Sequence, residues 1–259
     1  MNSLRKQDLI NFFHEIGVES GMLLELHVNF ETIGKVLGGA QTFVDALLEV
    51  LGYNGTLVMN MPCLDNQEPS YLKDLELEDY RIYRNEYPAY LPANSELSTD
   101  DCVLENVRRR DKAVFTSHPN HAFVAIGKYA KLLCNYQKGD FGLDELSPLG
   151  RMYELKASCL LMGSPYSEMT SLYLSQYKAE SQPIILNGSS VNKDGYRTWH
   201  KYLDFALSNA EFDQVGEIME RRHLVTIANL NDAVCRLLRI DIAVDQGISY
   251  FNEKYKYYR

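Results

Sequence analysis

The chain lacks the features of proteins built on disulfides, on cysteine metal sites or on membrane spans. Its five cysteines are an odd number and no two have CxxC spacing, which argues against a disulfide framework and a cysteine-bound metal. No uninterrupted apolar run approaches the roughly 20 residues that cross a bilayer. Residues 1–8 also lack the apolar core of a signal peptide. We therefore expect a reduced, cytoplasmic protein that does not bind membranes.

Basic residues are outnumbered, with 26 Lys and Arg against 35 Asp and Glu and a net charge of −9. A general nucleic-acid-binding protein normally has a basic balance, so we expect no nucleic-acid partner. The negative charge suits a cationic small-molecule ligand, although charge alone is better explained by simple solubility. The chain also has no internal repeat, low-complexity tract or linker. We therefore expect one domain over residues 1–259.

The hydrophobic pattern of the N-terminal part predicts strands alternating with helices. A first helix should begin after Ser3 as its cap and stop at Gly17. A strand at 22–27, a helix at 40–51 and a strand at 56–61 then form a unit of strand, helix and strand. Such a unit favours a sheet that is at least partly parallel. We predict an α/β fold, with a single domain containing a mixed β-sheet flanked by helices.

The remaining part of the chain is less regular. Residues 64–112 have little periodicity and predict an irregular excursion that forms one wall of a cleft. Further strands are expected at 113–116, 122–126 and 159–162, and a hairpin at 183–186 and 196–202. The C-terminal part predicts helices at 213–220 and 231–238, a strand at 224–228, and a final helix after Asp241.

Two segments have the composition of ligand-binding loops. Residues 27–40 place glycines between a strand and a helix, where free backbone N–H groups bind phosphate; the plainer explanation is a turn. Residues 116–121 put a polar cluster at a strand end, with Pro119 fixing the turn. His118 and His121 lack a third ligand, so we expect no metal site. The plainer role of His118 is hydrogen bonding within its turn.

A third segment identifies a family. Residues 159–177 read as a strand, a turn at Gly163 and a helix that follows the triplet Thr170-Ser171-Leu172. This pattern resembles the active-site segment of the antibiotic N-acetyltransferases, the aminoglycoside 3-N-acetyltransferase family. Two further segments, which hold Ser117-His118-Pro119 and Ser147-Pro148, resemble the same family. The resemblance extends from about residue 4 to residue 251.

The resemblance implies transfer of an acyl group from acetyl-coenzyme A to an amine of an amino sugar or aminocyclitol. The expected partner is a small-molecule amine of positive charge, and a homodimer is an open alternative to a monomer. The catalytic positions that the resemblance implies are His118, Ser171 and Tyr173. The cofactor-binding positions that it implies are His27, Asn29, Gly34, Gly38, Gly39 and Ser117.

The chain departs from the family pattern at two positions on one helix face. Where the family has a histidine and a glutamate, this sequence has Tyr173 and Gln176. Imidazole accepts a proton near neutral pH, whereas a phenol has a reference pKa of about 10. We therefore expect weak activity on ordinary aminoglycosides, with His118, His121 or water as the base. The alternatives are a degenerate member that binds coenzyme A or a sugar, and a partner-binding protein.

Overall fold

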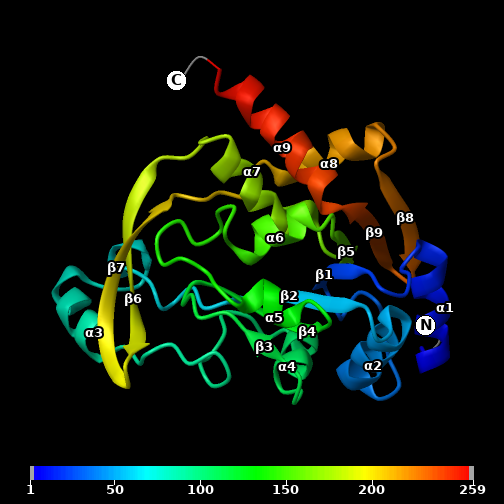
Figure 1. Cartoon of the computed structure of the whole chain (residues 1–259), viewed down its shortest axis with the longest axis horizontal. Coiled ribbons are helices and arrows are strands. Elements are labelled where there is room, and N and C mark those ends of the chain that lie inside the picture. Colours follow the sequence, from blue (N-terminus) through cyan, green and yellow to red (C-terminus); the bar gives the residue numbers. More distant parts are fainter. Residues whose placement is uncertain (1–2, 257–259) are drawn as a thin grey trace.

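The computed structural model describes residues 3–256, and its centre is a seven-stranded mixed sheet (Figure 1). The strands lie in the order β3-β4-β2-β1-β5-β9-β8. Their bounds are β1 Leu23–Val28, β2 Thr56–Pro62, β3 Val114–Phe115, β4 His121–Gly127, β5 Ser158–Met162, β8 Val225–Leu230 and β9 Ala233–Arg239.

The central strand β1 lies parallel to both of its neighbours, β2 and β5. The next strands outward, β4 and β9, are antiparallel to β2 and β5. The chain passes from β1 to β2 on one side and returns later to β5 on the other side. Ligands bind at the carboxyl ends of parallel strands where the chain direction switches in this way. The fold therefore places a binding crevice at the ends of β1, β2 and β5.

Helices cover both faces of the sheet, and each face has its own apolar core. The alternation along β1 divides the faces, because Leu24 and Leu26 pack into one core and Leu23 into the other. The first core contains α1 Lys6–Ile16, α2 Gly39–Leu51 and α4 Cys102–Arg108. The second contains α5 Ala130–Cys134, α6 Pro148–Glu154, α7 Tyr173–Lys178, α8 Phe212–Arg221 and α9 Ile240–Lys254.

A long hairpin, β6 Ile184–Lys193 and β7 Tyr196–Phe205, forms a separate two-stranded sheet. It arches along one side of the molecule with α3 Tyr80–Glu86 beside it (Figure 1). Its strands are longer than predicted, because their pairing continues to a tight turn at Asp194 and Gly195. The predicted excursion at 64–112 is tied to the hairpin through a bridge between Tyr90 and Val191.

Two predictions about single elements are wrong. Residues 231–238, predicted as a helix, form most of β9, which pairs with both β5 and β8. Asn231 has a φ of 51° and starts the tight turn from β8, and a short buried apolar run does not distinguish strand from helix. The first helix is capped by Arg5 rather than Ser3, with Asp8 accepting from the Arg5 backbone N–H at 2.8 Å. Within residues 3–256, no helix combines the length and apolar character needed to span a bilayer.

Candidate functional site

A cavity of about 630 Å³ opens at the carboxyl ends of the parallel strands. One wall comes from β1 and the loop after it, a second from β2 and the excursion at 99–104, and a third from the segment that leads into α7. The expectation that residues 64–112 form a cleft wall is therefore confirmed. The lining side chains used below are His27, Asn29, Glu31, Asp100, Asp101, Cys102, Glu168, Thr170 and Tyr173.

The cavity is acidic. Four carboxylates line it and, within the described part of the chain, no Lys or Arg does; the four are Glu31, Asp100, Asp101 and Glu168. Asp101 also caps α4 by accepting from the backbone N–H groups of Val103 and Leu104. Burial raises the pKa of its carboxyl, and the charge of Glu168 adds to this effect. A cavity with charge of one sign concentrates ligands of the opposite sign, here cations.

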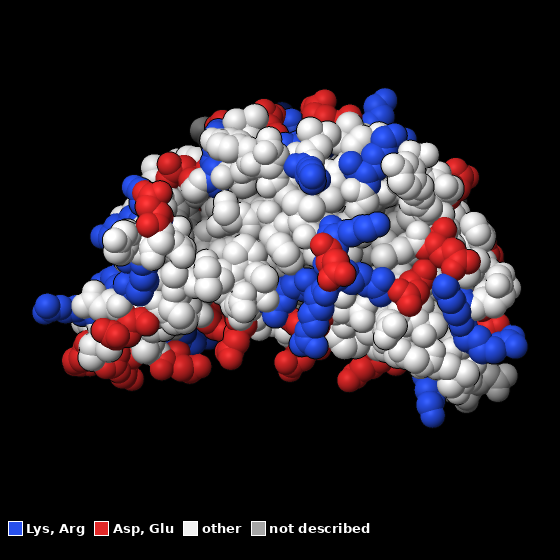
Figure 2. Space-filling model, turned by 60° about the horizontal axis from the view of Figure 1, so that its bottom comes forward, with Lys and Arg blue, Asp and Glu red and all other residues white. Residues whose placement is uncertain are grey.

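Positive and negative side chains are interspersed on the outer surface seen in Figure 2. Blue groups gather near the middle of this face around a few red ones, beside a broad uncharged area. This face therefore carries charges of both signs, whereas the cavity lining has carboxylates and, among the described residues, no Lys or Arg.

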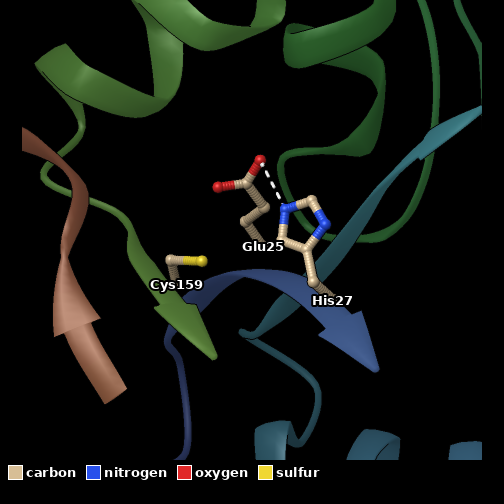
Figure 3. Close-up of side chains that lie close together, drawn as sticks. All are labelled: Glu25, His27 and Cys159. Atoms are coloured by element: carbon tan, nitrogen blue, oxygen red, sulfur yellow. Dashed lines mark ion pairs between the residues drawn. The ribbon is translucent and has the colours of Figure 1, made fainter. Parts of the chain in front are cut away.

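The central strand places Glu25 and His27 on the same face, two residues apart. Glu25 Oε1 lies 3.2 Å from His27 Nε2, and the Glu25 side chain is fully buried while that of His27 is 11% exposed. Figure 3 shows the carboxylate and the imidazole turned toward one another above β1, with Cys159 of β5 beside Glu25. The strand thus supports an acid–imidazole pair at the base of the cavity.

The segment before α7 is held against this pair by backbone contacts. The N–H of Ser171 donates to Glu25 Oε1 at 3.2 Å, and the N–H of Thr170 lies 3.3 Å from His27 Nε2. Gly163 permits the approach, since it has a φ of 66° and a Cβ there would lie 1.9 Å from Thr32 Oγ1. The structure therefore brings the predicted residues Ser171 and His27 together, although the Ser171 hydroxyl is buried without a hydrogen-bond partner within residues 3–256.

The two positions that depart from the family pattern have different surroundings. Tyr173 lines the cavity, and its ring packs on Phe212 at 4.9 Å between centroids. Burial raises the pKa of its phenol, so still less phenolate is present to act as a base at neutral pH. Gln176 is buried and binds the backbone of Ser208, donating to its carbonyl and accepting from its N–H. Gln176 therefore has an architectural role.

His118 lies outside the cavity, contrary to its predicted catalytic role. Its Nδ1 accepts from the N–H groups of Asn120 at 3.2 Å and His121 at 3.1 Å, and its Nε2 donates to the Gly139 carbonyl at 3.1 Å. Burial, with the nearby charge of His121, lowers the pKa of His118 to about 3. Both ring nitrogens are occupied, so the plainer explanation, hydrogen bonding within its turn, fits the structure.

His121 and the predicted cofactor residue Ser117 are also outside the cavity lining. His121 Nε2 lies 2.9 Å from Asp204 Oδ2, and Ser117 is exposed at the surface. Asn29 does line the cavity, and its N–H donates to the Met162 carbonyl at 2.9 Å. The predicted glycines are not among the lining residues: Gly34 and Gly38 lie on the same loop, and Gly39 begins α2.

One group within residues 3–256 has the spacing of metal ligands, namely Glu25, His27 and Cys159, whose ligand atoms lie within 4.8 Å of one another. Burial and the neighbouring Glu25 raise the pKa of the Cys159 thiol well above its usual value. A metal binds the thiolate form, and His27 Nε2 is already in contact with Glu25. We therefore assign no metal to this group.

Sequence reasoning missed Glu25 and the carboxylates of the cavity. The available signal was a single acidic residue inside the apolar run of β1, two positions before His27. A charged side chain on a buried strand is costly without a partner, so its presence there points to a functional pair. Asp101 and Glu168 gave no such signal, because they lie in irregular segments.

Comparisons with known proteins agree on one family. The family described as Aminoglycoside 3-N-acetyltransferase matches residues 26–252. The aminoglycoside N(3')-acetyltransferase-like protein YokD of Bacillus subtilis, derived from prophage SPbeta, is 30% identical over 250 residues, which cover 95% of this chain and 92% of YokD. Its crystal structure superposes with a TM-score of 0.95 at 29% identity, covering 99% of this chain and 96% of that chain.

Two further structures share the fold. Aminoglycoside acetyltransferase AAC(3)-Xa has a TM-score of 0.89 at 25% identity, covering 97% of this chain and 94% of its own. AAC-IIIb, solved as a binary complex with CoASH, has a TM-score of 0.87 at 18% identity and covers 98% of each chain. At that identity the likeness concerns the fold alone.

Proposed function

Because the chain belongs to the aminoglycoside 3-N-acetyltransferase family, we propose that it transfers an acetyl group from acetyl-coenzyme A to an amine of an aminoglycoside or a related amino sugar. The observation that carries this proposal is the acidic cavity at the ends of β1, β2 and β5. Amino sugars with several amines are cations at neutral pH, and four carboxylates favour their entry. A polyanionic or apolar acceptor would gain nothing from this lining.

The loop after β1 supports a site for the acyl donor. It leads from Asn29 at the cavity to the start of α2, which has no side-chain cap. The Gly39 N–H donates to the Val36 carbonyl at 3.0 Å, and the N–H groups that follow it in the first turn are the ones that could meet a phosphate. A Cβ at Gly38 would lie 2.2 Å from Thr42 Oγ1, so this glycine shapes the turn. Gly39 has open space where its side chain would be, which leaves room for a donor against the backbone.

The proposed reaction needs no covalent intermediate on the protein. The neutral amine attacks the thioester carbonyl carbon, the new C–N bond forms and the C–S bond breaks. The products are the N-acetyl amine and coenzyme A. Holding the amine and the thioester in one cavity accounts for much of the acceleration in such reactions.

Two measurements test this function on the full chain. Calorimetric titration with coenzyme A should show binding, and mass spectrometry should show an acetylated product when acetyl-coenzyme A is mixed with gentamicin, sisomicin or 2-deoxystreptamine. Product detection is preferable to a thiol reagent, because Cys102 is exposed and lines the cavity. Absence of both binding and acetylation would overturn the proposal.

A pair of matched variants tests where the acyl donor, acetyl-coenzyme A, binds. Gly39 and Gly195 both have positive φ, 62° and 86°, and neither has an atom within 4 Å of a built Cβ. Alanine should therefore impose a similar backbone strain at each. We expect G39A to raise the Kd of coenzyme A about tenfold, a cost of about 1.4 kcal/mol, while G195A at the hairpin tip leaves it unchanged. Equal effects of the two variants would place the donor elsewhere.

A further inference from the structure

The buried carboxylate of Glu25 is not explained by the fold. It lies on the face of β1 that packs into an apolar core, between β2 and β5, which contribute Val58 and Cys159 to the same core. An ionised carboxylate in such a place costs several kcal/mol unless it is paired. Its partners are His27 and the Ser171 N–H, and its Oε2 has no hydrogen-bond partner within residues 3–256.

We propose that Glu25 and His27 form the proton-accepting couple of the transfer reaction, with His27 as the general base and Glu25 as the residue that positions it. This inference rests on the proposed function. It names the group that takes the role of the family histidine, whose position is occupied by Tyr173 in this chain. The couple comes from the central strand instead of from α7.

The geometry leaves one ring nitrogen of His27 free to act. Nε2 lies 3.2 Å from Glu25 Oε1 and 3.3 Å from the Thr170 N–H. In the resting ring Nε2 accepts from the Thr170 N–H, so we assign the reaction to the other tautomer, in which the Nε2 proton faces the Glu25 carboxylate, the stronger partner. Nδ1 then carries the lone pair. It lies on the side of the ring turned away from Glu25 (Figure 3) and has no hydrogen-bond partner among the described residues.

No other histidine of the described residues combines a free ring nitrogen with access to the cavity. The chain has six histidines, all within the described part, and only His27 lines the cavity. The ring nitrogens of His118 are occupied, and His121 is paired with Asp204. The phenol of Tyr173 is protonated at neutral pH, because burial raises its pKa. Among the imidazoles and phenols considered, His27 is therefore the one placed to accept the proton of the amine.

The cavity carboxylates complement this role. Burial raises the pKa of the Asp101 carboxyl and the nearby His27 imidazole partly offsets that rise, so the two groups are close enough to interact electrostatically. Asp101 and Glu168 both line the cavity with His27. A cationic acceptor held by these carboxylates would therefore place one of its amines, in the neutral form, beside an imidazole that can take a proton during attack.

The proton balance closes without another reactant. His27 Nδ1 takes one proton from the attacking nitrogen as the C–N bond forms, and Glu25 stabilises the resulting imidazolium through Nε2. The electron pair of the breaking C–S bond goes to sulfur. The imidazolium then gives its proton to this thiolate, so coenzyme A leaves as the thiol and His27 returns to its neutral form.

The test compares H27A, E25Q and the control H14Q, which changes an exposed histidine of α1, in acetylation of sisomicin. We expect H27A to lower kcat by about 10²- to 10⁴-fold, the usual contribution of a general base. The Kd of coenzyme A should stay within threefold, and added imidazole should restore part of kcat. E25Q should lower kcat by at least about tenfold without raising the KM of sisomicin, because glutamine cannot stabilise the imidazolium.

If Glu25 and His27 act as a couple, the losses of kcat in H27A and E25Q should not add in the double variant. The double variant should lose no more than about threefold beyond H27A alone, since Glu25 acts through the imidazole. If H27A fails to fold, as judged by circular dichroism and thermal unfolding, H27N replaces it, because its amide can still donate to Glu25.

Three outcomes overturn the inference. An H27A protein with kcat within threefold of the parent does so while leaving the proposed function intact. An H27A protein that loses coenzyme A affinity and shows no imidazole rescue would make His27 a donor-binding residue only. A parent protein that neither binds coenzyme A nor acetylates sisomicin overturns both the inference and the proposed function.

Discussion

Gln176 holds the backbone of Ser208 through both polar atoms of its amide. Nε2 donates to the Ser208 carbonyl, and Oε1 accepts from the Ser208 N–H at 3.2 Å. This contact fixes the chain between β7 and α8, where Asn209 reaches the cavity. An amide can make this pair of bonds, whereas an ionised carboxylate repels the carbonyl. The glutamine that replaces the family glutamate therefore matches the hydrogen-bonding groups of the Ser208 backbone.

Restoring the family residue should consequently harm the protein. We expect Q176E to lower the free energy of unfolding by about 2 kcal/mol at pH 8, because it leaves the Ser208 carbonyl without a donor and buries a charge. The loss should shrink at pH 5, where a protonated glutamic acid can donate. Urea unfolding at the two pH values measures this. A loss that does not depend on pH would point to packing instead.

Tyr173 should contribute little as an acid or base. Its ring packs on Phe212, and burial raises its pKa, so the phenol stays protonated at neutral pH. The hydroxyl can still donate one hydrogen bond to a bound ligand, worth about 1 kcal/mol. We expect Y173F to lower kcat/KM by less than tenfold and to leave the pH–rate profile unchanged between pH 6 and 9. A much larger loss, with a changed profile, would make Tyr173 catalytic.

The carboxylates of the cavity should control affinity for a charged acceptor. The double variant D101N/E168Q removes two charges while asparagine keeps the cap of α4. We expect the KM for sisomicin to rise about tenfold at low salt and its salt dependence to weaken, since screening acts on the same attraction. The control E217Q changes an exposed residue of α8 that is not part of the cavity lining. An unchanged KM would separate acceptor binding from this cavity.

Local patterns predicted most of the sheet and its helices, because strand alternation, turn glycines and the Ser147 cap act over a few residues. Ser147 accepts from the N–H groups of Leu149 and Gly150, as its position before Pro148 indicates. The prediction of a helix at 231–238 is wrong because the strand character of β9 depends on its two neighbours in the sheet. One neighbour, β5, is distant in the sequence, and the other, β8, precedes β9 across a tight turn. A short apolar run that is paired on both sides has no hydrophobic periodicity that would distinguish a strand from a helix.

The site was harder to predict for a related reason. The family resemblance selected His27 and Ser171, which the structure brings together through Glu25. It also selected His118, whose ring nitrogens form hydrogen bonds with the backbone of Gly139 and Asn120 in the folded chain. A histidine that titrates and one that is held neutral look the same in a sequence. The difference lies in burial and in the partners of each ring nitrogen.

The neutral His118 predicts a loss of stability in acid. Its pKa is about 3 in the folded chain, because burial disfavours the charged form, against about 6.5 when unfolded. The unfolded state therefore binds more protons between these values, so the free energy of unfolding falls as pH drops, by about 1.4 kcal/mol per pH unit well below pH 6.5. Asp204 adds to this only in stronger acid. Burial alone would raise its pKa, but the hydrogen bond and charge of His121 outweigh burial and hold that pKa below its usual value.

A comparison of the parent with H118Q from pH 6.5 to 4.5 isolates the imidazole of His118, because contributions of other groups are common to both proteins. Denaturant unfolding of the parent should lose about 2 kcal/mol across this window. H118Q replaces the imidazole with an amide that has no charged form, so its stability should be lower at pH 7 and much less dependent on pH. The control H14Q changes an exposed histidine of α1 and should keep the slope of the parent. A parent and an H118Q variant with equal slopes would show that His118 takes up its proton without unfolding the chain.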